Sequence, residues 1–219
     1  YVDADDLAFQ LAGKENFTIE FWMHAGPQPQ IRTSLFSINK PSPGDNEFLM
    51  ILGETSNPGD QKLNIYDQNS PNGRFVLQSP DDITGECHHI AYVKKGNIGE
   101  AFVDGVSIGT HNIYYSITSN HRVSFGQDYD GINASEFYKG NLWNIAIWNT
   151  ARNNLEIRRD AQYHVKGFED GLIAYYDANQ GDIANQDTCS RYPYCYGQNN
   201  PLEIELKDLT TNQLDLPLR

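Results

Sequence analysis

The sequence lacks any long apolar run and has few basic residues. No hydrophobic stretch approaches the roughly 18 residues that a membrane-spanning helix requires, so we expect no membrane insertion. Only 16 Lys and Arg stand against 29 Asp and Glu, which gives the 219 residues a formal net charge of −13. Because this field repels nucleic acid and anionic membrane surfaces, neither is an expected partner. The acidity fits either simple solubility or a cluster of carboxylates that holds a cation.

Cysteine is also scarce, at three residues. Cys189 and Cys195 bracket the short segment SRYPY, and this spacing favours a local disulfide formed in an oxidising compartment. Two free thiols are the alternative. Cys87 lies in an apolar stretch and is predicted to be a buried free thiol that packs as a small hydrophobe. The chain opens at Tyr1 with neither Met nor a signal-peptide pattern, so we expect a mature form or an excised domain.

The common catalytic motifs are missing. The sequence has no GxSxG elbow, no Walker loop and no HExxH helix. The segment Glu203-Ile204-Glu205 comes nearest to the spaced carboxylates of sandwich glucanases, but it lacks a third acid at the right place. His88 and His89 are consecutive in a strand-like stretch, so they point to opposite faces and are not a zinc pair. We therefore expect no enzyme, and a polysaccharide-cleaving enzyme is the weaker alternative.

Short stretches with period-2 alternation recur along the chain and predict half-buried β-strands. They cover residues 17–25, 34–38, 47–52, 62–66, 74–78, 88–94, 100–109, 122–126, 141–149 and 171–177. Asp104-Gly105 in the seventh stretch predicts a tight hairpin turn. The segment from Thr150 to Val165 breaks the pattern and predicts one short helix near 153–163.

These elements predict an all-β fold, a two-sheet antiparallel jelly-roll sandwich with one short helix. No internal repeat, linker or low-complexity tract divides the chain. We therefore expect a single domain over 1–219, in which residues 180–219 form an extension that closes the sandwich. Within that extension, PLEIELKDL at 201–209 is predicted to be a final strand.

Two acidic segments suggest a cation site. Asp128 and Asp130 supply two carboxylates on one side of a loop, with the carbonyl of Tyr129 between them. Asp45-Asn46 follows Pro43-Gly44, where a turn exposes side-chain oxygens. Calcium takes six to eight hard oxygens of these kinds, so the segments predict a calcium site if the fold brings them together. Asp, Asn and Gly are also ordinary turn formers, which is the alternative.

Aromatic residues are plentiful, with thirteen Tyr among the 219 residues. Tyr129 and Tyr138 lie near the acidic segments, and aromatic faces stack on sugar rings while their polar tips make hydrogen bonds. They are therefore candidate ligand contacts. Packing in the core is the alternative for rings of this kind.

Taken in order, several segments resemble the laminin G-like and pentraxin-like domains of the concanavalin A-like superfamily. The resemblance covers roughly residues 1–180. It rests on YVDADDLAFQLAGKENFTIEFWM, CHHIAYVKKGNIGEAFVDGVSIGT, VSFGQDYDG, FYKGNLWNIAIWNTA and GLIAYYDANQGDIANQD. Two segments, SLFSINKPSPGDNEFLM and FGQDYD, are similar to the parts of pentraxins that bind calcium.

The resemblance implies a set of functional residues. The implied Ca²⁺ ligands are Asp45, Asn46, Asp128, Asp130, the carbonyl of Tyr129, and Glu136, which stands where pentraxins use Gln. Ile51 matches the apolar residue against which some pentraxins pack choline.

The sequence also departs from the pentraxin pattern. Glu20 and Ala91 stand at the positions of the pentraxin disulfide, and Cys87 stands where the family usually has Trp. The loop between Asp130 and Glu136 is shorter and lacks an acidic ligand. One calcium ion is therefore implied more strongly than two.

Together these features predict a non-catalytic, calcium-dependent module that binds a carbohydrate or another small ligand. Such a lectin-like or adhesive module belongs to a secreted or cell-surface protein. The expected partner is a glycan or a small anionic ligand, and a cell-surface glycoprotein is a further candidate. The main alternative is a protein-interaction or structural domain in which calcium only rigidifies loops.

Overall fold

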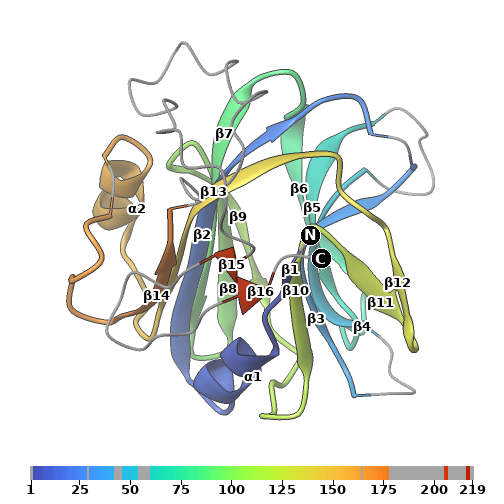
Figure 1. The fold of residues 1–219 in the computed structure, drawn as a ribbon, viewed down its shortest axis with the longest axis horizontal. Helices are drawn as coiled ribbons and strands as arrows, with labels where there is room; N and C mark the ends of the chain where they lie inside the picture. Colours follow the sequence, from blue (N-terminus) through green and yellow to red (C-terminus); the bar gives the residue numbers. More distant parts are fainter. Residues whose placement is uncertain are drawn as a thin grey trace.

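Two antiparallel sheets of six strands each face one another in a sandwich (Figure 1). The structure is a computed structural model that describes residues 2–28, 30–41, 46–53, 60–163 and 165–177, and the backbone of 205–206 and 216–217. The first sheet, called sheet A, has the strand order β1-β10-β3-β4-β5-β6, and the second, sheet B, has the order β14-β13-β2-β7-β8-β9. The predicted jelly-roll class is therefore confirmed.

The strands of sheet A are β1 (Val2–Asp3), β3 (Thr33–Asn39), β4 (Asn46–Leu52), β5 (Lys62–Asp67), β6 (Phe75–Asp82) and β10 (Arg122–Phe125). Those of sheet B are β2 (Asn16–Ala25), β7 (Cys87–Lys95), β8 (Ile98–Val103), β9 (Val106–Asn112), β13 (Gly140–Trp148) and β14 (Leu172–Tyr176). Two further ribbons pair β11 (Asp128–Asp130) with β12 (Asn133–Ser135), and β15 (Glu205–Leu206) with β16 (Leu216–Pro217). Of the predicted final strand, only residues 205–206 fall within the described part.

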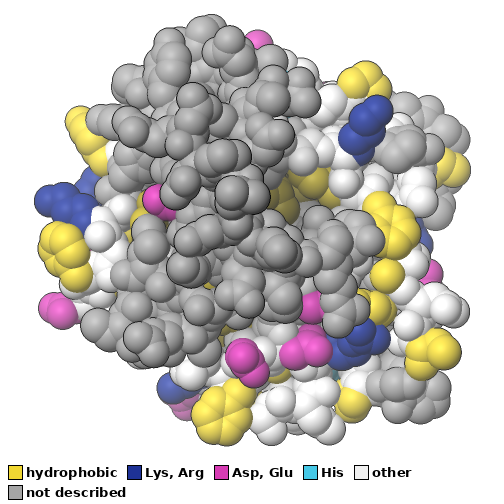
Figure 2. All heavy atoms as spheres, in the orientation of Figure 1, with side chains coloured by type: hydrophobic (Ala, Val, Ile, Leu, Met, Phe, Trp, Pro, Cys, Tyr) yellow, Lys and Arg dark blue, Asp and Glu magenta, His cyan; other side chains and the backbone are white. Residues whose placement is uncertain are grey.

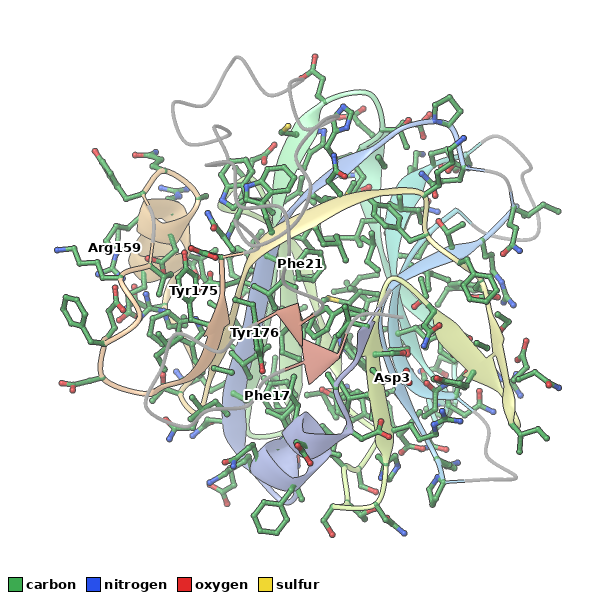
Figure 3. The ribbon with its side chains drawn as sticks, in the orientation of Figure 1. Asp3, Phe17, Phe21, Arg159, Tyr175 and Tyr176 are labelled. Carbon is green, nitrogen blue, oxygen red and sulfur yellow. The ribbon has the colours of Figure 1, made fainter. Side chains whose placement is uncertain are left out.

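Alternation along β2 decides which face meets the core. Phe17, Ile19 and Phe21 are fully buried in the main core cluster, and Figure 3 labels two of them between the sheets. The intervening residues, such as Thr18 and Glu20, therefore lie on the outer face of sheet B. Since β2 pairs with both β7 and β13, this outer face is continuous across three strands.

The predicted hairpin turn is confirmed. Asp104 and Gly105 connect β8 to β9, with φ values of 52° and 74°. Positive φ at both central residues is the type I′ signature, which suits the right-handed twist of the paired strands.

The sequence predicted one helix, and the described part of the chain contains two. The predicted one is α2 (Asn154–Asp160), which begins with a capping box between Asn153 and Glu156. The additional one is α1 (Asp5–Leu11), and acidic side chains gather on the face of the molecule near it (Figure 2). A helix of seven residues is too short to be stable alone, so its propensity gives little signal. It forms because Leu7, Ala8 and Leu11 are buried against the sandwich. No helix of the described residues is long and apolar enough to cross a membrane.

Cys87 corrects one expectation. It lies at the start of β7 beside Trp22 and is disulfide-bonded, so the predicted free thiol at this position is wrong. Cys189 and Cys195 lie outside the described residues. Because the chain has three cysteines, a disulfide at Cys87 competes with the predicted local pair for the same thiols. Spacing in the sequence favours short loops, whereas a disulfide depends on which thiols the fold brings together.

Peptide mapping without reductant tests the pairing. We expect the peptide that contains Cys87 to be recovered crosslinked to a peptide that contains Cys189 or Cys195. One cysteine should then accept alkylation after unfolding. Recovery of the Cys87 peptide in alkylated, uncrosslinked form, with Cys189 joined to Cys195, would contradict this expectation and support the local disulfide.

A chain of buried hydroxyls ends at a half-buried histidine on β9. The Tyr115 hydroxyl donates to that of Tyr92 over 3.2 Å, and the Tyr92 hydroxyl lies 2.9 Å from His111 Nε2. His111 Nδ1 lies 2.9 Å from the carbonyl oxygen of Asn112, which only accepts, so Nδ1 carries the hydrogen and Nε2 accepts from Tyr92. Burial lowers the pKa of His111 from its usual 6.5. The imidazole is therefore neutral in the folded state at neutral pH.

This neutral imidazole should make stability depend on pH. Because the folded pKa of His111 lies below the unfolded one, its contribution is present above about pH 6.5 and declines as the pH falls toward the folded pKa. The loss amounts to about 1.4 kcal/mol for each unit of pKa difference. Urea unfolding between pH 8 and 5 should therefore show a steeper acid-side loss in the wild type than in His111→Gln. Equal slopes would mean that His111 keeps its ordinary pKa.

Candidate metal centre

The β11–β12 ribbon brings the second predicted acidic segment to sheet A. Asp128 opposes Ser135 in the ribbon, and β11 contacts both β3 and β4. Figure 1 shows the ribbon on the side of sheet A that faces away from sheet B. Asn46, at the start of β4, opposes Asn39 at the end of β3. The topology therefore places Asp128 beside Asn46, as predicted, although the two lie far apart in the sequence.

Asn39 is the centre of this cluster, and sequence reasoning missed it. Its Nδ2 lies 2.8 Å from Asn46 Oδ1, 2.7 Å from Asp128 Oδ1 and 3.3 Å from the Tyr129 carbonyl oxygen. An amide nitrogen carries two hydrogens, so it cannot satisfy three acceptors fully. Asn39 Oδ1 is buried and has no hydrogen-bond partner among the described residues. The cluster therefore holds more oxygen acceptors than donors.

The side chain of Asn46 adds to this excess of acceptors over donors. Its terminal atom nearest to Asp128 lies 3.0 and 3.2 Å from the two carboxylate oxygens, and 2.8 Å from Asn39 Nδ2. If this atom is the amide nitrogen, it donates to Asp128 but faces another nitrogen on Asn39. If it is the oxygen, it accepts from Asn39 but faces two carboxylate oxygens. With Asp128 ionised, neither orientation satisfies both neighbours, whereas a cation between the oxygens would.

The Asp128 carboxyl is fully buried. Burial raises its pKa, and hydrogen bonds from Asn39 and the Tyr129 N–H oppose this rise. The Tyr129 N–H donates to Asp128 Oδ1 over 2.5 Å. Asp130, two residues along, is exposed, and its Oδ2 accepts from the Ser135 hydroxyl at 3.0 Å. The two carboxylates of the DYD segment thus have different environments, one inside the cluster and one at its edge.

Glu136 stands next to the ribbon in a strained backbone conformation. Its φ is +49°, a region that non-glycine residues rarely adopt, and its carbonyl accepts from the Ser34 N–H at 2.8 Å. Its carboxylate pairs with Arg32, yet Oε2 is buried without a hydrogen-bond partner among the described residues. Burial raises the pKa of Glu136 to about 7, with Arg32 opposing this rise and Asp128 adding to it. One carboxylate oxygen is therefore committed to Arg32, and the other is not.

The predicted ligand contacts are less open than expected. The Tyr129 hydroxyl donates to Asp3 Oδ1 over 2.6 Å, and the Arg122 guanidinium lies 3.3 Å from the ring centroid. Ile51 is fully buried with Leu49 and Tyr66. Tyr138 is half-buried and packs against the main core. Contact between these side chains and a ligand stays a prediction.

The cluster suits a hard cation better than a transition metal. Within the described residues, no group of three or more His, Cys, Asp or Glu side chains gathers to hold a metal. The oxygens around Asn39 are instead a mixture of amide, carbonyl and carboxylate oxygens, which is the mixture that calcium takes. Asp45 lies outside the described residues. The position of Asn39, a few residues before Asp45 and Asn46 in the sequence, is the one sequence signal that could have found it.

Residues 1–158 match the family described as the concanavalin A-like lectin/glucanases superfamily, in its laminin G type, and the chain belongs to this family. A Bacteroides ovatus protein described as carbohydrate binding is similar in structure, with a TM-score of 0.64 and 13% identity over 93% of this chain. The chain spans 52% of that protein. A heptameric SAP-like pentraxin from Limulus polyphemus has a TM-score of 0.58 and 20% identity, over 74% of this chain and 77% of the pentraxin. No curated protein sequence matches significantly.

Proposed function

We propose that this chain is a non-catalytic, calcium-dependent module that binds a carbohydrate or another small ligand, within a secreted or cell-surface protein. The observation that carries the proposal is the mismatch at Asn46, whose terminal atom lies 3.0 and 3.2 Å from the two carboxylate oxygens of Asp128. A calcium ion would let Asn46 present its oxygen there without repulsion. The positive charge of the ion would compensate the surplus of oxygen acceptors over donors in the cluster.

The chain's own oxygens supply part of a calcium coordination shell. Asn46, Asp128 and the Tyr129 carbonyl form its centre, and the uncommitted Oε2 of Glu136 is a further candidate. Asp45 and Asp130 complete the predicted set. Calcium takes six to eight oxygens, so positions not filled by the protein are left for water or for a ligand. Bound there, the ion would attract sugar hydroxyls or an anionic group.

A carbohydrate is the favoured ligand. The family description covers lectins and glucanases, and the similar Bacteroides ovatus protein is described as carbohydrate binding. The sequence lacks the spaced carboxylates of sandwich glucanases, which favours a lectin-like role over cleavage. The loops of a shared fold do not fix the ligand, so its identity has to be measured.

Thermal and urea unfolding with calcium or with chelator test the metal centre. We expect calcium at a hundredfold excess over its Kd to stabilise the wild type by about 2.7 kcal/mol. Affinity should be modest, on the order of 10⁻⁴ to 10⁻³ M, as in many extracellular modules. Asp128→Asn keeps the shape of the side chain but removes its charge, so it should lose most of this gain. Asp81→Asn, an exposed acid on β6, is the matched control and should keep it. A wild type that responds equally to calcium and chelator would rule out the site.

A glycan array with calcium or with chelator tests the function. Glycan binding that is lost on chelation, and lost in Asp128→Asn, supports the proposal. Calcium-dependent stability without any glycan binding would favour a protein-interaction domain whose loops calcium rigidifies. If no glycan shows calcium-dependent binding and calcium leaves the stability unchanged, both readings fail.

A further inference from the structure

We propose a second ligand site in this chain, a cavity that takes a single uncharged sugar ring without calcium. The cavity has a volume of about 240 Å³ and lies where the α1–β2 turn, the end of β7 and the β9–β10 connection meet. None of the candidate calcium ligands lines it. The site therefore stands apart from the function proposed above, and either proposal survives the failure of the other.

The floor and rim of the cavity differ in chemistry. The floor is apolar and buried, and it comprises Leu11, Phe17, Tyr115 and Ile117. Figure 3 shows Phe17 at the end of β2 that lies next to α1. The rim carries polar groups, among them Asn97, Ser116 and Lys94. Of the aromatic rings that line the cavity, Tyr114 is the exposed one, so the C–H face of a sugar ring would pack on Tyr114 while its hydroxyls bond to polar groups at the edge.

One wall of the cavity is fixed by two buried carboxylates. The Tyr114 N–H donates to Asp67 Oδ2 at 2.8 Å, and the Ser116 N–H donates to Glu47 Oε1 at 2.9 Å. Asp67 is fully buried and Glu47 is 2% exposed, so these bonds are protected from water. They hold the connection by its backbone and leave the Tyr114 side chain outward, with 44% of its surface exposed. The cavity is therefore formed before a ligand arrives, which reduces the entropy cost of binding.

The opposite wall is held by Lys94. Its Nζ donates to the carbonyl oxygens of Lys14 at 2.8 Å and Glu15 at 2.9 Å. An ammonium has three hydrogens, and within the described residues these bonds use two of them. The third is available to a ligand hydroxyl.

Charge favours a neutral ligand. Two lysines and one glutamate line the cavity, which gives it a net charge of only one positive unit. The chain as a whole carries a net charge of −13, and this field repels anions. At 240 Å³, the cavity is smaller than the usual range of roughly 300–1,000 Å³ for ligand pockets, which fits one ring better than an oligosaccharide.

NMR titration in the presence of chelator tests this site. The probes are the methyl pyranosides of glucose, galactose and mannose, with glucuronate as the charged comparison. We expect saturable shifts of the amides at 94–97 and 113–117 with at least one neutral pyranoside, and weaker binding of glucuronate. Tyr114→Ala should weaken binding about tenfold, or about 1.4 kcal/mol. Tyr163→Ala removes another exposed tyrosine, which does not line the cavity, and should have no effect.

Three results would overturn the proposal. These are the absence of saturable shifts at 94–97 and 113–117 with every neutral pyranoside, tighter binding of glucuronate, and equal affinity in the wild type and Tyr114→Ala. Chelation removes any calcium-dependent binding from this experiment, so shifts that persist there belong to the cavity whatever the outcome at the metal centre.

Discussion

Replacing Phe48 with alanine is expected to destabilise the fold by about 3–5 kcal/mol. Phe48 on β4 is fully buried between the sheets. Its ring centroid lies 4.6 Å from that of Tyr92 and 4.9 Å from that of Tyr115. Removing the ring therefore opens a cavity in the most aromatic part of the core. Such a cavity adds its own cost to the lost transfer free energy, because close-packed neighbours collapse only partly.

Urea unfolding at constant pH measures this effect, and Phe9→Ala is the matched control. Phe9 on α1 is 71% exposed, so its loss should change stability by less than about 0.5 kcal/mol. The substitution of Phe48 should also weaken ligand binding at both proposed sites. Asn46 of the metal centre and Glu47 of the cavity wall immediately precede Phe48 in the chain. A loss below about 1 kcal/mol would mean that the sandwich closes around the missing ring.

The β-sandwich was predictable because its strands repeat a simple pattern. Alternation such as Phe17, Ile19 and Phe21 reflects one buried face per strand, and that pattern is local in sequence. The hairpin at Asp104-Gly105 was predictable for the same reason, since the turn chemistry lies in two adjacent residues. Helix α2 gave a third local signal, because the segment from Thr150 to Val165 breaks the period-2 alternation of the strands.

Other elements depend on contacts that the sequence does not display. Helix α1 exists because Leu7 and Leu11 are buried, not because seven residues favour a helix. The DYD segment was interpreted as a loop, yet it forms β11 and pairs with β12 across a two-residue turn. Three-residue strands carry too little alternation to be recognised from sequence.

The candidate site was predicted in part. The resemblance to pentraxins placed Asn46 and Asp128 together, and the structure does bring them together. The resemblance gave no sign of Asn39, whose position between these side chains depends on the register of β3 and β4. Nor did it indicate that Arg32 pairs with Glu136. Contacts of this kind join residues from separate elements, so no local sequence pattern predicts them.

A polar layer fixes α2 against the outer face of sheet B, and Arg152 is its centre. The guanidinium lies 3.8 Å from the ring centroid of Trp148 and pairs with Asp160. The Trp148 indole N–H donates to Glu20 Oε1 at 2.6 Å. Arg152 and Asp160 are buried, at 7% and 5% exposure, and Figure 3 shows Arg159 on the side of α2 away from the sheet. The layer thus joins the helix to two strands through charged groups with little access to water.

Arg152→Met should destabilise the fold by about 3 kcal/mol, at the lower end of the usual 3–5 kcal/mol for breaking a buried ion pair. Methionine keeps much of the packing on Trp148 but leaves Asp160 as a buried charge with one partner fewer. Arg159 Nη2 still lies 2.8 Å from Asp160 Oδ1, which limits the loss. The double variant Arg152→Met/Asp160→Asn should be more stable than Arg152→Met alone, because it removes the uncompensated carboxylate.

Arg158→Met is the matched control, since Arg158 lies on the same helix but is exposed. We expect it to change the free energy of unfolding by less than about 0.5 kcal/mol. Urea unfolding of the wild type, Arg152→Met, Asp160→Asn and the double variant forms a cycle that isolates the interaction of Arg152 with Asp160. If the double variant is less stable than Arg152→Met, then Asp160 stabilises α2 through Arg159 rather than through Arg152.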